Sequence, residues 1–225
     1  TYYSRAYATN SGGTGYGAVS SSFTTSACPP TLISQDNFRF FASSTPDGTL
    51  WTSRTMPSSR DRYWVTYGNG LFVSVSGTSD GNRVSTSPDG ITWTDRSVPE
   101  SNTWVSVTYG NGLFVAVSVD GTNRVMTSPD GITWTARSAA AAMAWRSVTF
   151  GGGKFVAVSS DVSANGVMTS LDGINWTQQT VSQTFSKCGV TYGNGLFVAV
   201  AGGAVSTAAD QIMTSPDGAT WTTQT

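Results

Sequence analysis

The feature that most constrains the fold is a seven-residue phrase, Ser-Pro-Asp-Gly-Ile-Thr-Trp in its commonest form, that recurs along the chain. Five copies occur, and they end at Trp51, Trp93, Trp134, Trp176 and Trp221. These positions differ by 42, 41, 42 and 45 residues. A period of this length indicates a repeat architecture, either a solenoid or a propeller.

A second phrase, Tyr-Gly-Asn-Gly-Leu-Phe-Val or a variant of it, precedes the first one in four of the five copies. Its Asn-Gly pair suits a type I′ turn, which joins two strands into a hairpin. The Pro-Asp-Gly of the first phrase forms another turn, because Pro presets φ and Gly accepts a left-handed conformation. Each repeat therefore holds four short antiparallel strands, which is one propeller blade.

We predict an all-β fold, namely a five-bladed β-propeller of four-stranded antiparallel blades. The predicted blades span residues 18–54, 55–97, 98–138, 139–180 and 181–225, and residues 1–17 form an N-terminal arm or linker. The first repeat is degenerate, and its limits come from laying it without gaps on the third. In that alignment Cys28 and Cys188 lie at opposite ends of innermost strands, so we do not expect them to be joined. Since the chain starts at Thr1 without a leader, we expect it to be a processed or excised piece.

The seven-residue phrase resembles the Asp box of sialidase-type β-propellers, Ser-x-Asp-x-Gly-x-Thr-Trp, with one residue fewer in the turn. It is also similar to tandem repeats of bacterial surface proteins and phage tail proteins, and tachylectin-type lectins share the blade number. The resemblance implies a structural turn whose Asp accepts hydrogen bonds from turn amides and whose Trp packs between blades. The residues concerned are Asp47, Asp89, Asp130, Asp172 and Asp217, with Trp51, Trp93, Trp134, Trp176 and Trp221.

The composition argues against several classes of function. The chain has no His, which removes imidazole catalysis and ordinary zinc sites. Twelve basic against 13 acidic residues give a net charge of −1, so we expect no nucleic-acid partner. No apolar run approaches the roughly 18 residues of a membrane span. We therefore expect no metal, no cofactor and no membrane span.

We also expect no catalytic residues, and hence that the chain is not an enzyme. Sialidases activate a Tyr with a Glu, and Glu100 is the only glutamate and has no Tyr beside it. A glycosidase would need a pair of carboxylates from Asp residues outside the seven-residue phrases. A glycosidase-like enzyme is therefore a lesser alternative.

The two faces of the predicted propeller differ in how closely the repeats agree. The Asn-Gly and Pro-Asp-Gly turns on one face are nearly identical, whereas the connections on the other face vary in length and residues. Variable loops on a uniform scaffold are typical of a recognition surface. We predict that a ligand binds there to Arg83, Arg124, Trp104, Trp145 and Trp64, since Arg and Trp suit sugars or a partner's backbone. The alternatives are packing between blades for the Trp residues and solvated strand ends for the Arg residues.

The sequence thus predicts a non-catalytic, lectin-like recognition or adhesion module that is extracellular, on a cell or virion surface or secreted. Its partner would be a surface glycan or a protein. The alternative is a structural subunit or decoration protein of an extracellular filament or virion, with self-assembly through residues 1–17.

Overall fold

The computed structural model describes the backbone of residues 7–10, 13–16, 33–36, 39–43 and 51. It describes backbone and side chains of residues 52–77, 81, 83–181, 186–202 and 212–224. Strands and turns make up this part of the chain, which contains no helix. The prediction of an all-β fold is therefore confirmed.

Four sheets of four strands have the same order, in which each strand pairs antiparallel with the next one in sequence. Blade two contains β6 (Arg62–Gly68), β7 (Leu71–Ser76), β8 (Val84–Ser87) and β9 (Thr94–Arg96). Blade three contains β10 (Trp104–Gly110), β11 (Leu113–Ser118), β12 (Val125–Ser128) and β13 (Thr135–Arg137). Blade four contains β14 (Trp145–Gly151), β15 (Lys154–Ser159), β16 (Val167–Ser170) and β17 (Thr177–Gln179). Blade five contains β18 (Lys187–Gly193), β19 (Leu196–Ala201), β20 (Ile212–Ser215) and β21 (Thr222–Gln224).

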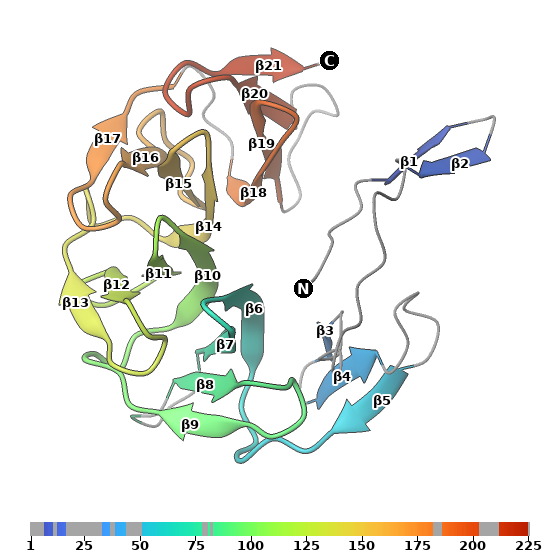
Figure 1. Cartoon of the computed structure of the whole chain (residues 1–225). Coiled ribbons are helices and arrows are strands. Elements are labelled where there is room, and N and C mark those ends of the chain that lie inside the picture. Colours follow the sequence, from blue (N-terminus) through green and yellow to red (C-terminus); the bar gives the residue numbers. More distant parts are fainter. Residues whose placement is uncertain are drawn as a thin grey trace.

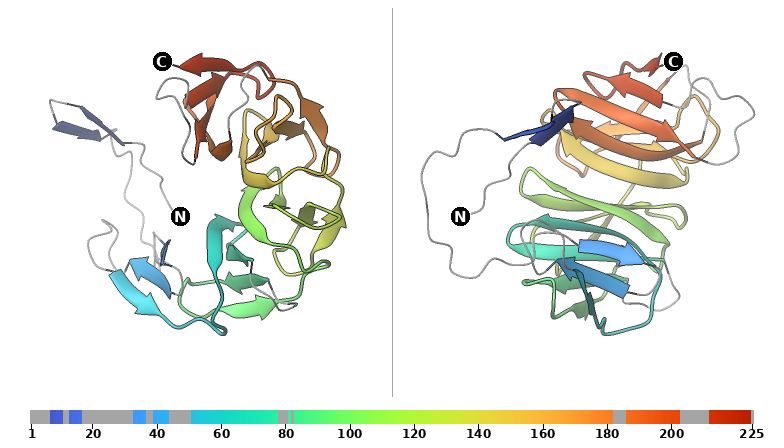
Figure 2. Two further views of the ribbon diagram at one scale, coloured as in Figure 1. Left: turned by 180° about the vertical axis from the view of Figure 1, so that it is seen from behind. Right: turned by 90° about the vertical axis from the view of Figure 1, so that its right-hand side faces the viewer.

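The four sheets follow one another around a common axis, as a β-propeller requires (Figure 1). The first strands β6, β10, β14 and β18 lie innermost, and β9, β13, β17 and β21 lie outside. Seen from the side, the sheets stack face to face (Figure 2). Apolar residues of each sheet can therefore be buried only against a neighbouring blade.

The first repeat contributes a three-stranded sheet of β3 (Ile33–Asp36), β4 (Arg39–Ser43) and β5 (Trp51–Arg54). β3 contacts β6 in the way that β7 contacts β10, so β3 takes the place of a second strand. The innermost strand predicted for this blade lies outside the described residues. The fold class and four complete blades are thus established, and the fifth blade and the blade boundaries stay predictions. The short hairpin of β1 (Tyr7–Asn10) and β2 (Gly13–Tyr16) falls within the predicted arm.

The alignment without gaps is wrong in the third strand of the first repeat. It places Ala42 on Val125, but Phe40 is the residue that pairs with Arg54 as Val125 pairs with Arg137. The reason is two extra residues, Ser44 and Thr45, between β4 and the Pro-Asp-Gly turn. The strand is therefore displaced by two positions.

The hairpin turns have the conformation that the sequence predicts. Asn111 and Gly112 have φ values of 49° and 76°, the two positive values of a type I′ turn. Asn69-Gly70 and Asn194-Gly195 repeat this geometry, and Gly152-Gly153 does so in blade four. The turn identity thus fixes the register of the innermost hairpin in every complete blade.

The hydrophobic core lies between the blades. On one side of a junction, Val73, Val75 and Val84 of blade two are fully buried. On the other side, Phe114 and Met126 of blade three belong to the same cluster. The blade three to four and blade four to five junctions repeat this pairing, with Val115, Val117 and Val125 against Phe155 and Met168, and Val156, Val158 and Val167 against Phe197 and Met213.

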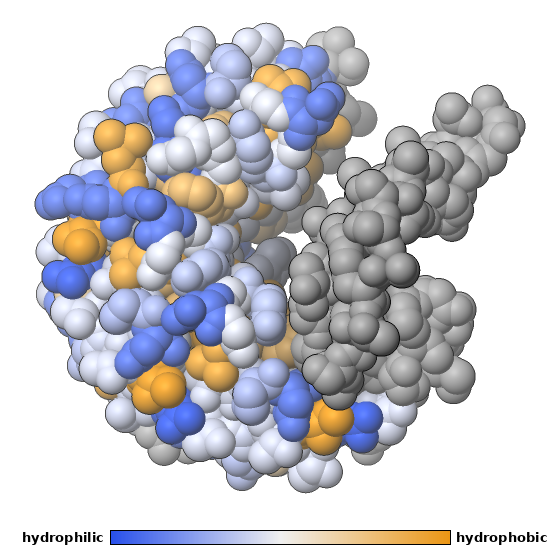
Figure 3. Space-filling view, in the orientation of Figure 1, coloured by the Kyte–Doolittle hydropathy of each residue, from blue (hydrophilic) through white to orange (hydrophobic). Residues whose placement is uncertain are grey.

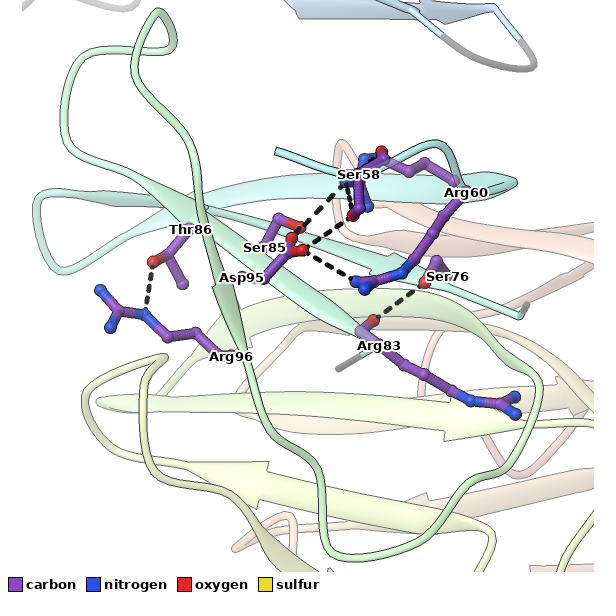
Figure 4. A network of polar contacts seen from close by, with 9 residues as sticks. Ser58, Arg60, Ser76, Arg83, Ser85, Thr86, Asp95 and Arg96 are labelled. Carbon is purple, nitrogen blue, oxygen red and sulfur yellow. Dashed lines mark hydrogen bonds and ion pairs between the residues drawn. The ribbon is translucent and has the colours of Figure 1, made fainter. Parts of the chain in front are cut away.

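Blade two departs from this pattern on the face that would meet the first repeat. Asp95 lies 3.1 Å from Nη1 of Arg60 and 3.7 Å from Nη2 of Arg62, and it accepts hydrogen bonds from Ser58 (2.7 Å) and Ser85 (2.6 Å) (Figure 4). Both arginines are more than nine-tenths buried. Buried guanidinium groups require such carboxylate and hydroxyl partners, so this face is adapted to a polar junction.

Blade five departs at the first residue of its innermost strand. Lys187 occupies the position of Trp104 and Trp145 and is fully buried. Its Nζ lies 3.4 Å from the carbonyl oxygen of Ser163. Burial lowers the pKa of Lys187 to about 8. Cys188 beside it carries a free thiol, and Cys28 lies outside the described residues.

We predict that Trp134→Ala lowers the free energy of unfolding by about 3 to 5 kcal/mol, as is usual when a buried indole is truncated. Trp134 is 8% exposed and belongs to the cluster between blades two and three. Urea unfolding measures the change, with Trp64→Ala as the matched control because Trp64 is 46% exposed. Equal stability of Trp134→Ala and the parent would contradict the assignment of this indole to the core.

We predict that Lys187→Met raises the stability at pH 7, because the buried ammonium group loses its hydration. The pKa of Lys187 is about 8 in the folded chain and about 10.4 in the unfolded chain. The parent therefore gains stability as the pH rises from about 8 to about 10, and Lys187→Met lacks this gain. Chemical unfolding between pH 7 and pH 10 checks both statements. A Lys187→Met protein no more stable than the parent at pH 7 would refute the first, and the same pH dependence in both proteins would refute the second.

Candidate functional site

The Ser-x-Asp-Gly turns form a local hydrogen-bond network that closes on itself. Oδ1 of Asp89 accepts the N–H groups of Ile91 and Thr92, both at 2.8 Å. Oγ of Ser87 donates to the same carboxylate at 2.9 Å and accepts the N–H of Gly90 at 2.8 Å. Asp130, Asp172 and Asp217 make equivalent bonds. Each of these four carboxylates thus accepts two backbone N–H groups of its own turn, and Asp47 lies outside the described residues.

The tryptophans of these turns complete the same unit. Nε1 of Trp93 donates to the carbonyl oxygen of Gly90 at 3.2 Å. Trp134, Trp176 and Trp221 bond in the same way to Gly131, Gly173 and Gly218. All four indoles are buried or partly buried within the core clusters. The side chain of Trp51 lies outside the described part of the chain.

The bonded N–H groups hold the turn carboxylates in their charged form. The N–H groups of Thr220 and Ala219 lower the pKa of Asp217 to about 2. The N–H of Thr133 likewise lowers the pKa of Asp130, and the N–H and side chain of Asn175 lower that of Asp172. A carboxylate with so low a pKa is a poor general acid near neutral pH. The turns therefore serve the structure of each blade.

The structure does not gather the residues predicted to bind a ligand into one open site. Trp104 and Trp145 are fully buried, and their Nε1 groups donate to the carbonyls of Glu100 (3.2 Å) and Ala141 (3.0 Å). Each indole holds a connecting loop against its own blade. Contact of these two tryptophans with a ligand stays a prediction. Their observed burial agrees with the alternative, which was packing between blades.

The two arginines of the predicted set also hold loops. Nη1 of Arg83 donates to the carbonyls of Gly77 (2.9 Å) and Asn102 (2.5 Å), and this side chain is buried. Arg124 is half-buried and donates to the carbonyls of Gly121 (3.1 Å) and Val119 (3.3 Å). Arg83 thereby joins blades two and three. The ligand-binding role of both residues stays a prediction.

Three carboxylates that hold connecting loops in place were not predicted from the sequence. Asp120 accepts the N–H and hydroxyl of Thr103 at 2.6 and 2.7 Å, and Asp161 accepts the N–H of Ala144 at 2.8 Å. Glu100 accepts the backbone and side-chain N–H groups of Asn123. Asp120 and Asp161 stand one repeat apart, so comparison of equivalent positions could have identified them.

A cavity of about 350 Å³ lies where the innermost strands meet. The described residues that line it come from β6, β10, β14, β18 and β19, and they are Trp64, Thr66, Val107, Thr108, Val148, Thr149, Gly189, Val190, Thr191, Val198 and Val200. We call it the central cavity. Most residues of its wall are valine or threonine. On the surface shown in Figure 3, in contrast, apolar side chains are scattered among polar ones. The threonines stand at equivalent positions, because the innermost strands share one register.

Trp64 lines the central cavity because blade two has Trp at a position of the innermost strand where the other complete blades have Ser or Gly. A β-bulge follows the first residue of each such strand, and the third residue is Trp64, Ser106, Ser147 or Gly189. Ser106 and Ser147 accept the N–H groups of Val148 and Val190, both at 3.1 Å, and so tie neighbouring blades together. The indole of Trp64 replaces such a hydroxyl and remains 46% exposed.

The central cavity offers apolar surface and hydroxyl groups. None of the lining residues that the structure describes carries a titratable side chain. Within the same part of the chain, no three His, Cys, Asp or Glu residues are grouped to hold a metal ion. No helix long and apolar enough to cross a membrane occurs among the residues described. The chemistry available in the cavity is therefore apolar contact and neutral hydrogen bonding.

The fold is shared with solved β-propeller structures. Two are of virginiamycin B lyase from Staphylococcus aureus, each with a TM-score of 0.62. One, a catalytically inactive form with quinupristin, is 14% identical over 72% of this chain and 56% of that chain. The other is 12% identical over 88% of this chain and 70% of that chain. The chain thus spans little more than half of the first lyase structure.

A structure of YCF48 bound to D1 peptide is also similar, with a TM-score of 0.56 and 16% identity. The match covers 86% of this chain and 66% of that chain. No protein-family model and no curated protein sequence matches the chain. At these identities the likeness shows the fold alone.

The expectation that the chain is not an enzyme is corrected by this comparison. It rested on residue types that sialidases and glycosidases need, whereas the lyase is an enzyme of another reaction class with the same fold. Residue requirements taken from one group of propeller enzymes therefore do not exclude catalysis on this fold.

We predict that Asp217→Asn loses stability relative to the parent at pH 5 and that the difference disappears at low pH. The pKa of Asp217 is about 2 in the folded chain, below the usual unfolded value of about 3.9. The contribution of the carboxylate is complete above about pH 4 and is lost as the pH falls through about 2. Urea unfolding of both proteins from pH 5 to pH 2 measures it. A constant difference over this range would show that the hydrogen bonds do not depend on the charge.

Proposed function

We propose that the chain is a recognition module that holds an uncharged part of a partner protein in its central cavity. The observation that carries the proposal is Trp64. Its side chain is 46% exposed and lines the cavity, where the other complete blades have Ser106, Ser147 and Gly189. Exposure of an apolar indole ring to water is unfavourable for the free protein, and Trp is a frequent anchor of binding interfaces.

The described residues that line the central cavity carry no charged side chain, which favours an uncharged ligand. A charged group entering it would lose hydration, and the described lining residues supply no opposite charge. The volume of about 350 Å³ is at the lower end of small-ligand pockets and suits one or two side chains of a peptide. The peptide bound in the YCF48 structure supports a protein ligand through fold-level analogy alone.

A carbohydrate is the second candidate, as the sequence suggested. The exposed face of Trp64 supports it, because indoles stack on sugar rings. A sugar ring carries hydroxyl groups on several sides, and each needs a partner when it leaves water. The cavity wall described here offers four threonine hydroxyls and no amide, carboxylate or guanidinium side chain. A protein segment with apolar side chains therefore fits better.

We place the module outside the cell, on a cell or virion surface or secreted. The support is the resemblance of its Ser-x-Asp-Gly turns to the Asp boxes of sialidase-type propellers and of surface and phage tail repeats. The low charge of the whole chain, with a net value of −1, suits recognition by contact rather than by long-range attraction.

We predict that Trp64→Ser weakens ligand binding about tenfold or more, which corresponds to about 1.4 kcal/mol or more for loss of an aromatic anchor. Serine is the residue at the same position in blades three and four, so the fold should tolerate it. An array of defined synthetic peptides and an array of purified glycans, both probed with the intact chain, provide the measurement.

The matched control is Ile132→Ser, because Ile132 is also exposed, at 42%, and does not line the central cavity. Binding that Trp64→Ser removes and Ile132→Ser leaves intact supports the proposal. Equal binding by Trp64→Ser and the parent would overturn it. Glycan ligands lost in Trp64→Ser would favour the second candidate.

A further inference from the structure

Four positions of the repeat have one residue in three of the complete blades and another in the fourth, and these four exceptions line a single pocket. In blade four, Lys154 replaces leucine, Leu171 replaces proline and Asn175 replaces threonine, and in blade five Ala219 replaces isoleucine. The residues of the other blades are Leu71, Leu113 and Leu196, then Pro88, Pro129 and Pro216, then Thr92, Thr133 and Thr220, and finally Ile91, Ile132 and Ile174.

The pocket has a volume of about 470 Å³ and lies between blades four and five. We call it the outer pocket, because β17, one of its walls, is the outermost strand of blade four. The residues on which its chemistry depends are Lys154, Leu171, Asp172, Asn175, Gln179 and Ala219.

The outer pocket lies away from the first repeat. β3 contacts β6 of blade two, whereas the pocket is formed by β15, β16, β17 and the Ser-Pro-Asp-Gly turn of blade five. β16 and β17 lie across the ring from β3 and β4 (Figure 1). The described strands of the first repeat therefore do not reach this pocket.

The junction between blades does not require a lysine at position 154. A Cβ atom at Gly131 would lie 3.1 Å from Cδ2 of Leu71, so in blade two the leucine covers the turn of the next blade. Lys154 occupies the leucine position, and its Nζ donates to the carbonyl oxygen of Asp217 at 2.9 Å. An ammonium group has three N–H groups, and this contact uses one of them. Lys154 thus holds the turn and keeps donors for a ligand.

The turn of blade four does not require an asparagine at position 175 either. Nδ2 of Asn175 donates to Oδ2 of Asp172 at 2.8 Å. In blade five, Oγ1 of Thr220 makes the same bond to Asp217 at 3.2 Å, so threonine is sufficient for the turn. Asparagine adds an amide oxygen and a second N–H to the wall of the pocket.

The other two exceptions change the shape of the pocket. Leu171 is 70% exposed and lacks the fixed φ with which proline presets the turn. It gives the pocket an apolar surface beside the polar groups. The isoleucines equivalent to Ala219 are between 38% and 43% exposed in the other blades. Alanine removes most of this side chain and leaves space at the rim.

The walls combine groups that bind hydroxyls from more than one side. Nε2 of Gln179 donates to Oγ1 of Thr169 at 3.0 Å, which directs the amide and leaves its oxygen as an acceptor. Asn175 and Asp172 supply further acceptors, and Lys154 supplies donors. The charges of Lys154 and Asp172 are opposite, and the other described residues of the wall are uncharged. A ligand without net charge therefore suits the pocket.

We propose that the outer pocket binds a neutral carbohydrate of one or two sugar rings. Its amides, carboxylate and ammonium group supply the partners that sugar hydroxyls need when they leave water, and Leu171 contacts the C–H groups of a ring. The volume lies within the range of small-molecule sites. The outer pocket shares no residue with the central cavity, so the inference goes beyond the proposed function and does not depend on it.

The test starts with an array of purified neutral and anionic glycans probed with the intact chain. Calorimetric titration with the neutral sugar found there then compares the parent with two variants. Ala219→Ile fills the rim and should abolish binding, and Asn175→Thr should weaken it about fivefold to tenfold. Both restore the residue of the three other complete blades, so the fold should tolerate them. Asn175→Thr serves alone if Ala219→Ile does not fold.

The matched control is Ile132→Ala, which makes the reverse exchange at the equivalent position of blade three and should leave binding unchanged. Binding lost in Ala219→Ile and retained in Trp64→Ser supports the outer pocket. No neutral glycan bound by the parent, equal binding by the parent and the pocket variants, or loss in Trp64→Ser instead would overturn the proposal. Peptide binding by the same proteins tests the central cavity separately, so failure of one proposal leaves the other standing.

Discussion

The structure depends on burial of the valines of one blade beneath aromatic and methionine side chains of the next. A blade has strands of three to seven residues and two faces, so it cannot bury its apolar residues alone. Val73, Val75 and Val84 lose all exposure only because blade three lies on them. The same packing fixes the distance between innermost strands, and the central cavity is the space that this distance leaves open.

The repeated turns belong to this packing. Gly131 has a φ of 74°, and a Cβ atom there would lie 2.9 Å from Cγ2 of Val73 in the preceding blade. The turn of one blade is thus pressed onto the valine strand of its neighbour, which explains why the Ser-x-Asp-Gly phrase varies so little. Connections on the opposite face are not held in this way. They are tied instead by individual carboxylates such as Asp120 and Asp161.

The fold could be predicted because each part of the repeat has a local physical cause. Asn111-Gly112 specifies a type I′ turn, and Asp130 specifies its own set of amide partners, whatever lies around them. The site could not be predicted in the same way. Trp104 and Trp64 stand two positions apart in equivalent strands, yet one is fully buried and the other is 46% exposed. A β-bulge separates the two positions: Trp104 is buried in the junction between blades, whereas Trp64 lines the central cavity. This bulge is not visible in the local sequence.

In the innermost strands, the departures from the repeat concentrate at the two ends of the run of complete blades. At the first position of the innermost strand, blades three and four have Trp, whereas blades two and five have Arg62 and Lys187. At the third position, blades three and four have Ser, whereas blades two and five have Trp64 and Gly189. Blades three and four each pack between two complete blades, and they have the same residue types at these two positions. Blades two and five stand at the two ends of this run, and the cavity that joins Trp64 to Val200 is lined by strands of all four complete blades. Of the four residues that break the repeat at these two positions, Trp64 and Gly189 line the central cavity, whereas Arg62 and Lys187 are buried within the fold.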